Sequence, residues 1–458
     1  MRKFLLILLL LLLVSAGVAY WWVGRDGAPR ITVIRPEKVL GARGSVEIAV
    51  AAPGGPLTQL DVIFEQGDRS ATLYSLGGPQ GELQQEGADT FRVTIPATRR
   101  EIQGLESGDG RIVINAARTG PYGIRTLRSS VTHPVRVRLE PPRVAVLSMH
   151  HYINHGGSEF VVFRATPSDV TAGVRVGDRT YPAFPGSAVG IADPNVRVAV
   201  YALLHDQDLN TPMSVFATDE AGNTATAAID SRVFPKNYRR SRIEVPDTFL
   251  QRVVPAILDN TPEIADVVEN PDDLVSAFLT INGELRRRNA ETIASFAAKS
   301  EPRRLWRGPF RQLGGSQVES AFADHRTYFH NGREIDQQIH LGFDLAVTAN
   351  VPILAANAGT VVYADYLGIY GNCVIVDHGL GVQSLYAHLS SIDVSVGQDV
   401  ATGDQLGRSG MTGLAGGDHL HFTMLVGGNP VSPVDWWSSQ WMEDRILRKI
   451  REAGGTVD

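Results

Sequence analysis

The sequence predicts a mainly β protein of several domains, with an N-terminal membrane anchor and a short helical segment ahead of a C-terminal antiparallel β domain. Three observations predict this class. The chain has 458 residues, and about 150 residues per domain allow roughly three domains. Apolar residues alternate with period two over most of the chain, as they do in half-buried strands. A single long apolar run stands at the start, while 43% hydrophobic and 20% charged residues overall exclude both wholesale disorder and a polytopic membrane protein.

Charge and cysteine content narrow the classes of function. The 43 basic and 49 acidic residues give a net charge of −6, which does not fit a protein that binds nucleic acid through its charge. We therefore expect no nucleic-acid partner. Cys373 is the only cysteine, so the sequence excludes an internal disulfide framework and a cysteine-based zinc site. Any bound metal must be held by histidine and carboxylate side chains.

The N-terminal segment, residues 1–25, predicts export. Arg2 and Lys3 precede an apolar run of 20 residues, Phe4 to Val23, that ends in aromatic side chains; at this length a helix covers the roughly 30 Å hydrocarbon core of a bilayer. Basic residues are typical of the cytoplasmic side and aromatic residues of the interface. We therefore expect a single transmembrane anchor, with the rest of the chain facing the periplasm or the cell exterior. The alternative is a signal peptide cut at residues 17–19, which also exports the chain.

Two β modules are expected next, at residues 30–140 and 141–235. In both, short alternating apolar stretches are separated by Gly/Pro turns, and Pro141-Pro142 marks the joint. Residues 215–229 form a strand, a D-x-A-G-N turn and a second strand. This hairpin resembles the last hairpin of bacterial immunoglobulin-like modules, so we expect two immunoglobulin-like β-sandwiches. Such modules space, bind or dock rather than catalyse, which suggests an envelope protein as their partner.

A helical segment is expected at residues 245–300, because the apolar period changes from two to that of a helix. Asn270-Pro271-Asp272 is a start signal for one helix. One face of this helix carries the apolar residues Leu274, Phe278, Ile281 and Leu285. The run at 286–288, three consecutive arginines, is interpreted as a solvated helix face rather than a binding motif.

The C-terminal domain, residues 310–440, concentrates histidine in three short motifs, and a helix or tail follows at 441–458. The motifs are H-x-G-x-D at 340–344, Y-x-H-L-S at 386–390 and H-L-H-F at 419–422. Histidines two apart point to the same face of a strand, and Gly342 favours extended chain for the first motif as well. Zinc takes three or four nitrogen and oxygen ligands, with one position left for water in a catalytic site. Two histidines and one aspartate satisfy this requirement.

These motifs resemble the lysostaphin-type, or LytM-like, zinc endopeptidases of peptidoglycan, and the glycine-rich stretch 403–422 follows the same family pattern. The resemblance covers residues 310–436, about a quarter of the chain. It implies the duplicated-hybrid-motif fold, an antiparallel β groove walled by loops. It also implies Zn2+ as cofactor, with His340, Asp344 and His421 as metal ligands and His388 and His419 as catalytic residues that do not bind the metal.

The resemblance implies that the chain hydrolyses peptide cross-links of peptidoglycan and that its partners are the peptidoglycan stem peptides. A zinc site with one carboxylate is positively charged, so the pKa of a water on the metal would fall from 15.7 towards about 7. His388 and His419 are suited to take the proton of that water, to stabilise the oxyanion and to protonate the leaving amine. Which histidine performs which step stays open, as does the bond that is cut.

Two other functions stay open. The chain could be an inactive LytM-like activator or scaffold of cell-wall hydrolases, or an exported protease that acts on an envelope protein. Because every ligand and both partner histidines are present, we favour the active enzyme. We also expect the apolar face of the helical segment to cover the groove. Tyr328 is a candidate for the tyrosine that polarises the substrate in some relatives.

Overall fold

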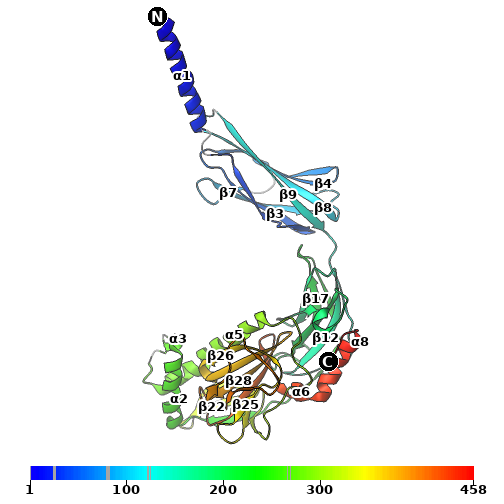
Figure 1. Cartoon of the computed structure of the whole chain (residues 1–458), viewed down its shortest axis with the longest axis vertical. Helices are drawn as coiled ribbons and strands as arrows, with labels where there is room; N and C mark the ends of the chain where they lie inside the picture. Colours follow the sequence, from blue (N-terminus) through cyan, green and yellow to red (C-terminus); the bar gives the residue numbers. More distant parts are fainter. Residues whose placement is uncertain are drawn as a thin grey trace. The chain divides into compact units, whose positions relative to one another are not determined.

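The computed structural model describes residues 2–23, 27–78, 83–120, 123, 125–265, 267–268 and 270–457. These residues form two compact units. The first unit comprises the chain up to residue 142 together with residues 218–224, and the second comprises residues 143–217 and 225–458. Most regular structure is β, and helices are few (Figure 1). This confirms the mainly β class.

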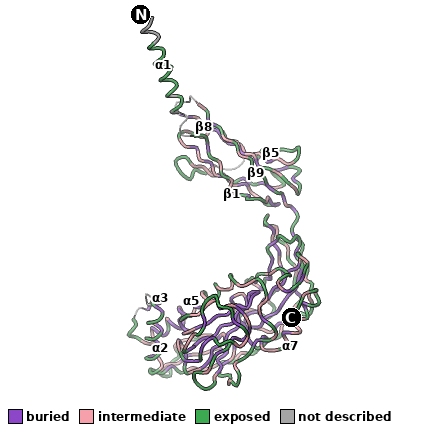
Figure 2. The backbone as a smooth tube through the Cα atoms, viewed as in Figure 1, coloured by how far each residue is buried: buried purple, intermediate pink, exposed green. Residues whose placement is uncertain are grey.

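The N-terminal segment forms the helix α1 (Arg2–Val23), whose described side chains are exposed (Figure 2). Within the described residues, no helix combines the length and the apolarity that a membrane crossing requires. The transmembrane anchor expected at residues 1–25 is therefore not supported. The side chains of Arg2, Lys3 and Trp22, which the expected orientation used, lie outside the described residues.

The rest of the first unit consists of two sheets around one hydrophobic core. One sheet has the strand order β1 (Arg30–Arg35), β3 (Arg43–Ala51), β7 (Thr90–Thr98), β6 (Leu83–Gln85), and the other the order β2 (Val39–Gly41), β9 (Thr126–Arg138), β8 (Gly108–Thr119), β4 (Leu57–Gln66), β5 (Arg69–Ser75). Alternate residues point inward: Val46, Ile48 and Val50 of β3 share the core with Val62 and Phe64 of β4. The predicted β module is thus present, while its immunoglobulin-like assignment stays a prediction.

The second β module begins the second unit. Its sheets have the orders β10 (Arg143–Val146), β12 (Ser158–Thr166), β16 (Val196–Ala202), β15 (Phe184–Pro185); β14 (Arg179–Pro182), β13 (Thr171–Val176), β17 (Met213–Thr218), β18 (Thr224–Ala228); and β11 (His151–Asn154), β19 (Ser231–Phe234), with a 3-10 turn η2 (Gly186–Val189). The predicted hairpin is β17–β18. Its turn is closed by Asp219, whose backbone N–H donates to the carbonyl of Asn223 and whose side chain accepts from the N–H of Asn223.

The helical segment follows where it was predicted. It comprises α2 (Asp247–Asn260), α3 (Pro262–Ala265), α4 (Leu274–Thr280), the π-helical turn η3 (Ile281–Leu285), α5 (Arg286–Phe296) and the 3-10 turn η4 (Ala297–Lys299). The Asp273 carboxylate caps α4 by accepting from two backbone N–H groups. The predicted apolar face packs against α2 and Tyr328 in a core of its own. Phe278 of this face also lines the cavity of the C-terminal domain, so the expectation that the face covers the groove stays a prediction.

The C-terminal domain is built on an eight-stranded sheet. Its order is β21 (Gln317–Ser320), β24 (Phe343–Ala346), β32 (Leu420–Val426), β28 (Val382–Leu389), β27 (Asn372–Gly379), β26 (Gly359–Tyr366), β30 (Asp399–Val400), with β33 (Asn429–Val431) also on β32. Two three-stranded sheets flank it, β20 (Arg240–Glu244), β22 (Asp324–His330), β23 (Arg333–His340) and β25 (Pro352–Leu354), β31 (Gln405–Arg408), β29 (Ser391–Ile392). Further turns and helices are η5 (Gly368–Tyr370), α6 (Pro433–Trp437), α7 (Ser439–Trp441), η6 (Met442–Leu447) and α8 (Arg448–Glu452).

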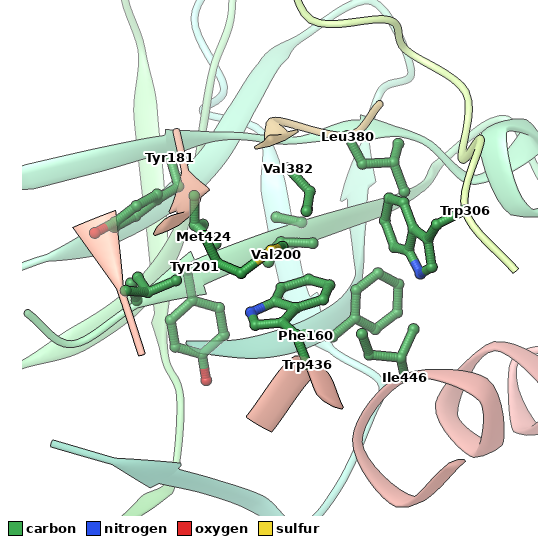
Figure 3. Packing of buried hydrophobic residues seen from close by; sticks show 14 of the residues in the cluster. Phe160, Tyr181, Val200, Tyr201, Trp306, Leu380, Val382, Met424, Trp436 and Ile446 are labelled. Atoms are coloured by element: carbon green, nitrogen blue, oxygen red, sulfur yellow. The ribbon is translucent and has the colours of Figure 1, made fainter. Parts of the chain in front are cut away.

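The two faces of β32 have different partners. Phe422, Met424 and Val426 point into a core shared with β12 and β16 of the second β module, where Met424 lies among Phe160, Val200 and Trp436 (Figure 3). The alternate residues, from His421 to Leu425, line a cavity on the opposite face. The second β module therefore covers one face of the sheet, and the predicted ligand His421 lies on the opposite face.

Candidate metal centre

Three predicted ligands meet where β23, β24 and β32 come together. His340 is the last residue of β23, and Asp344 lies directly opposite His421 on the antiparallel strands β24 and β32. A glycine is needed at position 342, between His340 and Asp344, because a Cβ there would lie 2.5 Å from the His421 ring. The glycine of the H-x-G-x-D motif thus makes room for the third ligand.

The donor atoms of these residues form a nearly equilateral triangle. His340 Nε2 lies 2.9 Å from Asp344 Oδ1 and 3.0 Å from His421 Nδ1, and His421 Nδ1 lies 3.0 Å from Asp344 Oδ1. All three residues are buried, and they are the cluster of possible metal ligands found among the described residues. In a tetrahedral zinc site with ligands about 2.0–2.1 Å from the metal, donor atoms lie about 3.3 Å apart. The triangle fits this geometry closely.

Hydrogen bonds on the outer side of each ring leave lone pairs inside the triangle. The Thr423 hydroxyl donates to the carbonyl of Leu341, so His421 Nε2 must donate to Thr423 Oγ1 at 3.0 Å and its Nδ1 keeps a lone pair. His340 Nδ1 faces the carbonyl of Ala321 and the hydroxyl of Ser320, which leaves its Nε2 as the inner atom. Second-shell hydrogen bonds of this kind fix the tautomer of metal-binding histidines.

The chemistry of the donor set therefore fits a divalent cation. Three electron-pair donors about 3 Å apart repel one another when no proton or cation lies between them. Two neutral imidazoles and one carboxylate are the ligands that zinc takes in hydrolytic sites. The residues would hold zinc through His340 Nε2, Asp344 Oδ1 and His421 Nδ1.

The two predicted catalytic histidines lie beside this cluster. The ring centroid of His388 is 4.9 Å from that of His419 and 5.7 Å from that of His421. Each uses Nδ1 on a backbone carbonyl, His388 on Thr412 at 2.8 Å and His419 on Gly417 at 2.9 Å. Their Nε2 atoms remain for the site, and His419 Nε2 is 3.4 Å from Asp344 Oδ1. All five predicted site residues are thus brought together.

The backbone of His388 is unusual. Its φ is +62°, in the left-handed region that non-glycine residues rarely adopt. Such conformations persist where surrounding structure holds them, often at functional sites. Here β28 ends at Leu389, and the Thr412 carbonyl fixes the ring.

Burial and charge shift the pKa values in the cluster. Burial lowers the pKa of His421 to about 4, and burial together with the neighbouring imidazoles lowers the pKa of His388 well below its ordinary value. For Asp344, burial raises the pKa, but the hydrogen bonds and charges of the histidines outweigh it and hold the pKa well below the usual range. Burial lowers the pKa of His419, yet Asp344 shifts it upward overall. The ligand carboxyl is thus ionised and His421 neutral, the protonation states that a metal requires.

Two residues in the site were not predicted. Arg326 Nη2 donates to Asp344 Oδ2 at 2.7 Å, so the outer carboxylate oxygen is held while Oδ1 faces the triangle. The Tyr370 ring packs edge-on against His421, with centroids 5.5 Å apart. Tyr328, the predicted candidate tyrosine, also lines the groove, with its ring packed against Phe278 of the helical segment, and its role stays a prediction. The alternation along β22, which puts residues 324, 326 and 328 on one face, is the signal that could have found Arg326.

The cluster lies in a groove of about 890 Å³. Residues of β32 and β28 form part of its lining, and the helical segment and β20 contribute walls. Ile293 of α5 packs on Leu385 of β28 and Leu425 of β32, and α5 lies beside the sheet (Figure 1). The groove is therefore built partly by elements outside the C-terminal domain.

Fold and ligand cluster together define an antiparallel β domain with a buried His/Asp/His cluster that could hold a metal ion. Residues 338–433 match the model of peptidase family M23. This stretch is therefore an M23 peptidase domain, as the motifs predicted.

Several known proteins resemble parts of the chain. The chain is 38% identical to DD-carboxypeptidase/endopeptidase Mpg of Neisseria meningitidis serogroup B over 97 residues, 21% of this chain and 22% of that protein. It is 39% identical to peptidoglycan DD-endopeptidase ShyA of Vibrio cholerae over 93 residues, 20% of this chain and 22% of that protein. The chain thus matches about a fifth of the length of these relatives. The catalytic domain of lysostaphin from Staphylococcus simulans is similar at 25% identity and a TM-score of 0.21, covering 31% of this chain and 96% of that structure.

Proposed function

We propose that the chain is a zinc-dependent endopeptidase that hydrolyses peptide cross-links of peptidoglycan. The observation that carries the proposal is the triangle of His340, Asp344 and His421, whose three lone pairs converge beside two further histidines in an open groove. The names of the relatives, which include a peptidoglycan DD-endopeptidase, support the choice of substrate.

The residues around the ligand triangle have different roles in the proposed reaction. When bound, zinc would supply a positive charge that polarises the scissile carbonyl and lowers the pKa of water. Arg326 keeps the Asp344 carboxylate turned towards the metal position. His388 and His419 each present Nε2 to the groove because Nδ1 is tied to a carbonyl. They can accept the proton of the attacking water and return a proton to the leaving amine.

Purified sacculi provide the test. We expect the full chain to release soluble fragments whose masses correspond to cleaved cross-links, and we expect a chelator to stop the release and zinc to restore it. The matched control is the His421→Ala variant in the same preparation. Cleavage of an unfolded protein without any release from sacculi would instead identify an exported protease of another substrate.

The inactive activator is the main competing function, and the site argues against it. An activator needs neither a complete ligand set nor two buried histidines whose Nε2 atoms face the site, and burying polar groups without function is costly. Stimulation of another hydrolase by the His421→Ala variant, with no cleavage by the unaltered chain, would favour the activator.

We further propose that the enzyme works in the cell envelope and that its two β modules position it there against an envelope partner. The apolar N-terminal run, which predicts export, supports this location. A reporter enzyme active only outside the cytoplasm, fused to the C-terminus, tests it. Reporter activity is expected, and its absence would contradict export.

A further inference from the structure

The groove beside the metal centre is rich in arginine. Seven arginines and five acidic residues contribute to its lining. Three of these arginines form ion pairs with carboxylates: Arg326 with Asp344, Arg242 with Glu244 and Arg287 with Glu291. The arginines without a carboxylate partner determine what the groove can bind.

Arg286, the first residue of α5, is one of these. Its Nε and Nη2 donate to the backbone carbonyl and the side-chain oxygen of Asn282, one helical turn earlier. Asn282 is fully buried and donates to Asp336 of β23 at 2.7 Å. Within the described residues, Arg286 forms no ion pair. Its guanidinium is therefore held in place by a neutral side chain and a backbone carbonyl, not by a carboxylate.

Arg286 lies close to the metal centre. The backbone N–H of Ile369 in η5 donates to Asn289 Oδ1 of α5 at 3.0 Å, which holds η5 against the helix that begins at Arg286. Tyr370 in turn packs on the ligand His421. The helix that begins at Arg286 is thus joined through η5 to the metal site, and Arg286 lines the same groove as the three ligands. Arg286, Asn282 and Asp336 lie outside residues 338–433, which match the family model.

A second such arginine stands on β20. Arg240 lines the same groove and is exposed. Its pairing neighbour across the strands is His325, and no ion pair involves Arg240 among the described residues. Two uncompensated guanidinium groups on two walls of one groove favour an anionic ligand, since arginine binds carboxylates through paired hydrogen bonds.

We propose that Arg286, supported by Arg240, binds a free carboxylate of an acidic substrate peptide and so selects substrates that carry this group near the scissile bond. This inference rests on the proposed peptidase function and adds the charge of the substrate to it. Arg286 is fixed before substrate arrives, so little side-chain entropy is lost on binding. A substrate peptide that carries an uncharged amide in place of this carboxylate would leave the Arg286 guanidinium without a counter-ion.

Two synthetic cross-linked stem peptides that differ only in one group, a free carboxylate or its amide, test the proposal. The wild-type chain is expected to cleave the free acid with a kcat/KM on the order of tenfold to hundredfold above that of the amide, the range of a hydrogen bond to a charged group. Arg286→Gln is expected to bring the ratio of the two kcat/KM values close to one. Arg286→Lys retains part of the ratio, because it keeps the charge without the paired geometry.

Controls separate recognition from folding. Arg333→Gln removes an exposed arginine of β23 that does not line the groove, and it should keep the wild-type ratio. Arg240→Gln should reduce the ratio even if Arg286→Gln proves unstable. A loss of activity in Arg286→Gln that is equal for both peptides would overturn the proposal, because a merely structural role affects both alike. Equal cleavage of both peptides by the wild-type chain would also overturn it and leave the peptidase function standing, whereas failure on both peptides and on sacculi would refute that function itself.

Discussion

The division between metal ligands and proton-transfer residues gives the sharpest prediction. His421→Ala removes one corner of the ligand triangle, and His388→Ala removes a ring that lies beside the triangle without belonging to it. We expect the first variant to lose zinc and turnover together. We expect the second variant to keep nearly stoichiometric zinc while its rate falls.

The magnitudes follow from the contacts. Structural zinc sites with four ligands bind with about 10–16 kcal/mol, so one of three ligands is worth on the order of 3 kcal/mol or more, at least a hundredfold in zinc affinity. His388 has its Nδ1 on the Thr412 carbonyl at 2.8 Å and is not a member of the ligand cluster found among the described residues. Its loss removes a general acid or base, which costs on the order of 10² to 10⁴ in rate. His419→Ala should resemble His388→Ala, although Asp344 is its neighbour.

Metal analysis of each purified variant, beside initial rates on sacculi, measures both quantities. His330→Ala is the matched control, because His330 is not among the residues that line the groove and bonds the backbone carbonyl of Val245. It should keep both zinc and rate. The reasoning would be refuted if His388→Ala purified without zinc, or if His421→Ala retained zinc and activity.

Three other regions give further predictions. Burial raises the pKa of Asp435 to about 6, so the folded state binds an extra proton near pH 5. Stability from this group is present below pH 4 and lost as the pH rises through 6, by about 3 kcal/mol. Asp435→Asn should therefore raise the melting temperature at pH 8 relative to wild type, and a gain only at pH 4 would contradict this. Arg326→Gln leaves the buried Asp344 carboxylate without its arginine partner, so the variant should lose about 3–5 kcal/mol of stability in the presence of a chelator and less in the presence of zinc. Thermal unfolding under both conditions measures the two losses. Equal losses would contradict a stabilising role of the ion pair. Cys373 is fully buried and burial raises its pKa, so a thiol reagent should modify it only after unfolding, and modification of the native protein would contradict its position.

The metal centre could be predicted because its ligands lie in short motifs. The spacing of His340 and Asp344 around Gly342, and of His419 and His421, depends only on local extended geometry. The helical segment was predictable for a similar reason, since its apolar period is local. Long-range pairing was not. Arg326 reaches Asp344 because β22 pairs with β23 in one particular register, and no local pattern specifies that register.

The run at 286–288 shows the same limit. We expected a solvated face, and Arg287 and Arg288 do pair with Glu284 on the helix surface. Arg286 instead bonds Asn282, because consecutive residues on a helix differ by about 100° and its guanidinium is turned away from Glu284, although Arg286 and Arg287 both line the groove. Three identical residues in sequence therefore have two different environments. Only the packing of α5 on the sheet distinguishes them.

The placement of these residues separates two properties of the enzyme. The residues that would hold zinc and transfer protons lie within 338–433, the stretch shared with the M23 family. The uncompensated charges of the groove walls, Arg240 and Arg286, lie before it. A peptidase that kept the first set and changed the second would cut the same kind of bond in a differently charged peptide. In the proposed peptidase, substrate selection would therefore be carried by the segment that precedes the catalytic strands, and substitutions there should change which peptide is cut before they change whether zinc is bound.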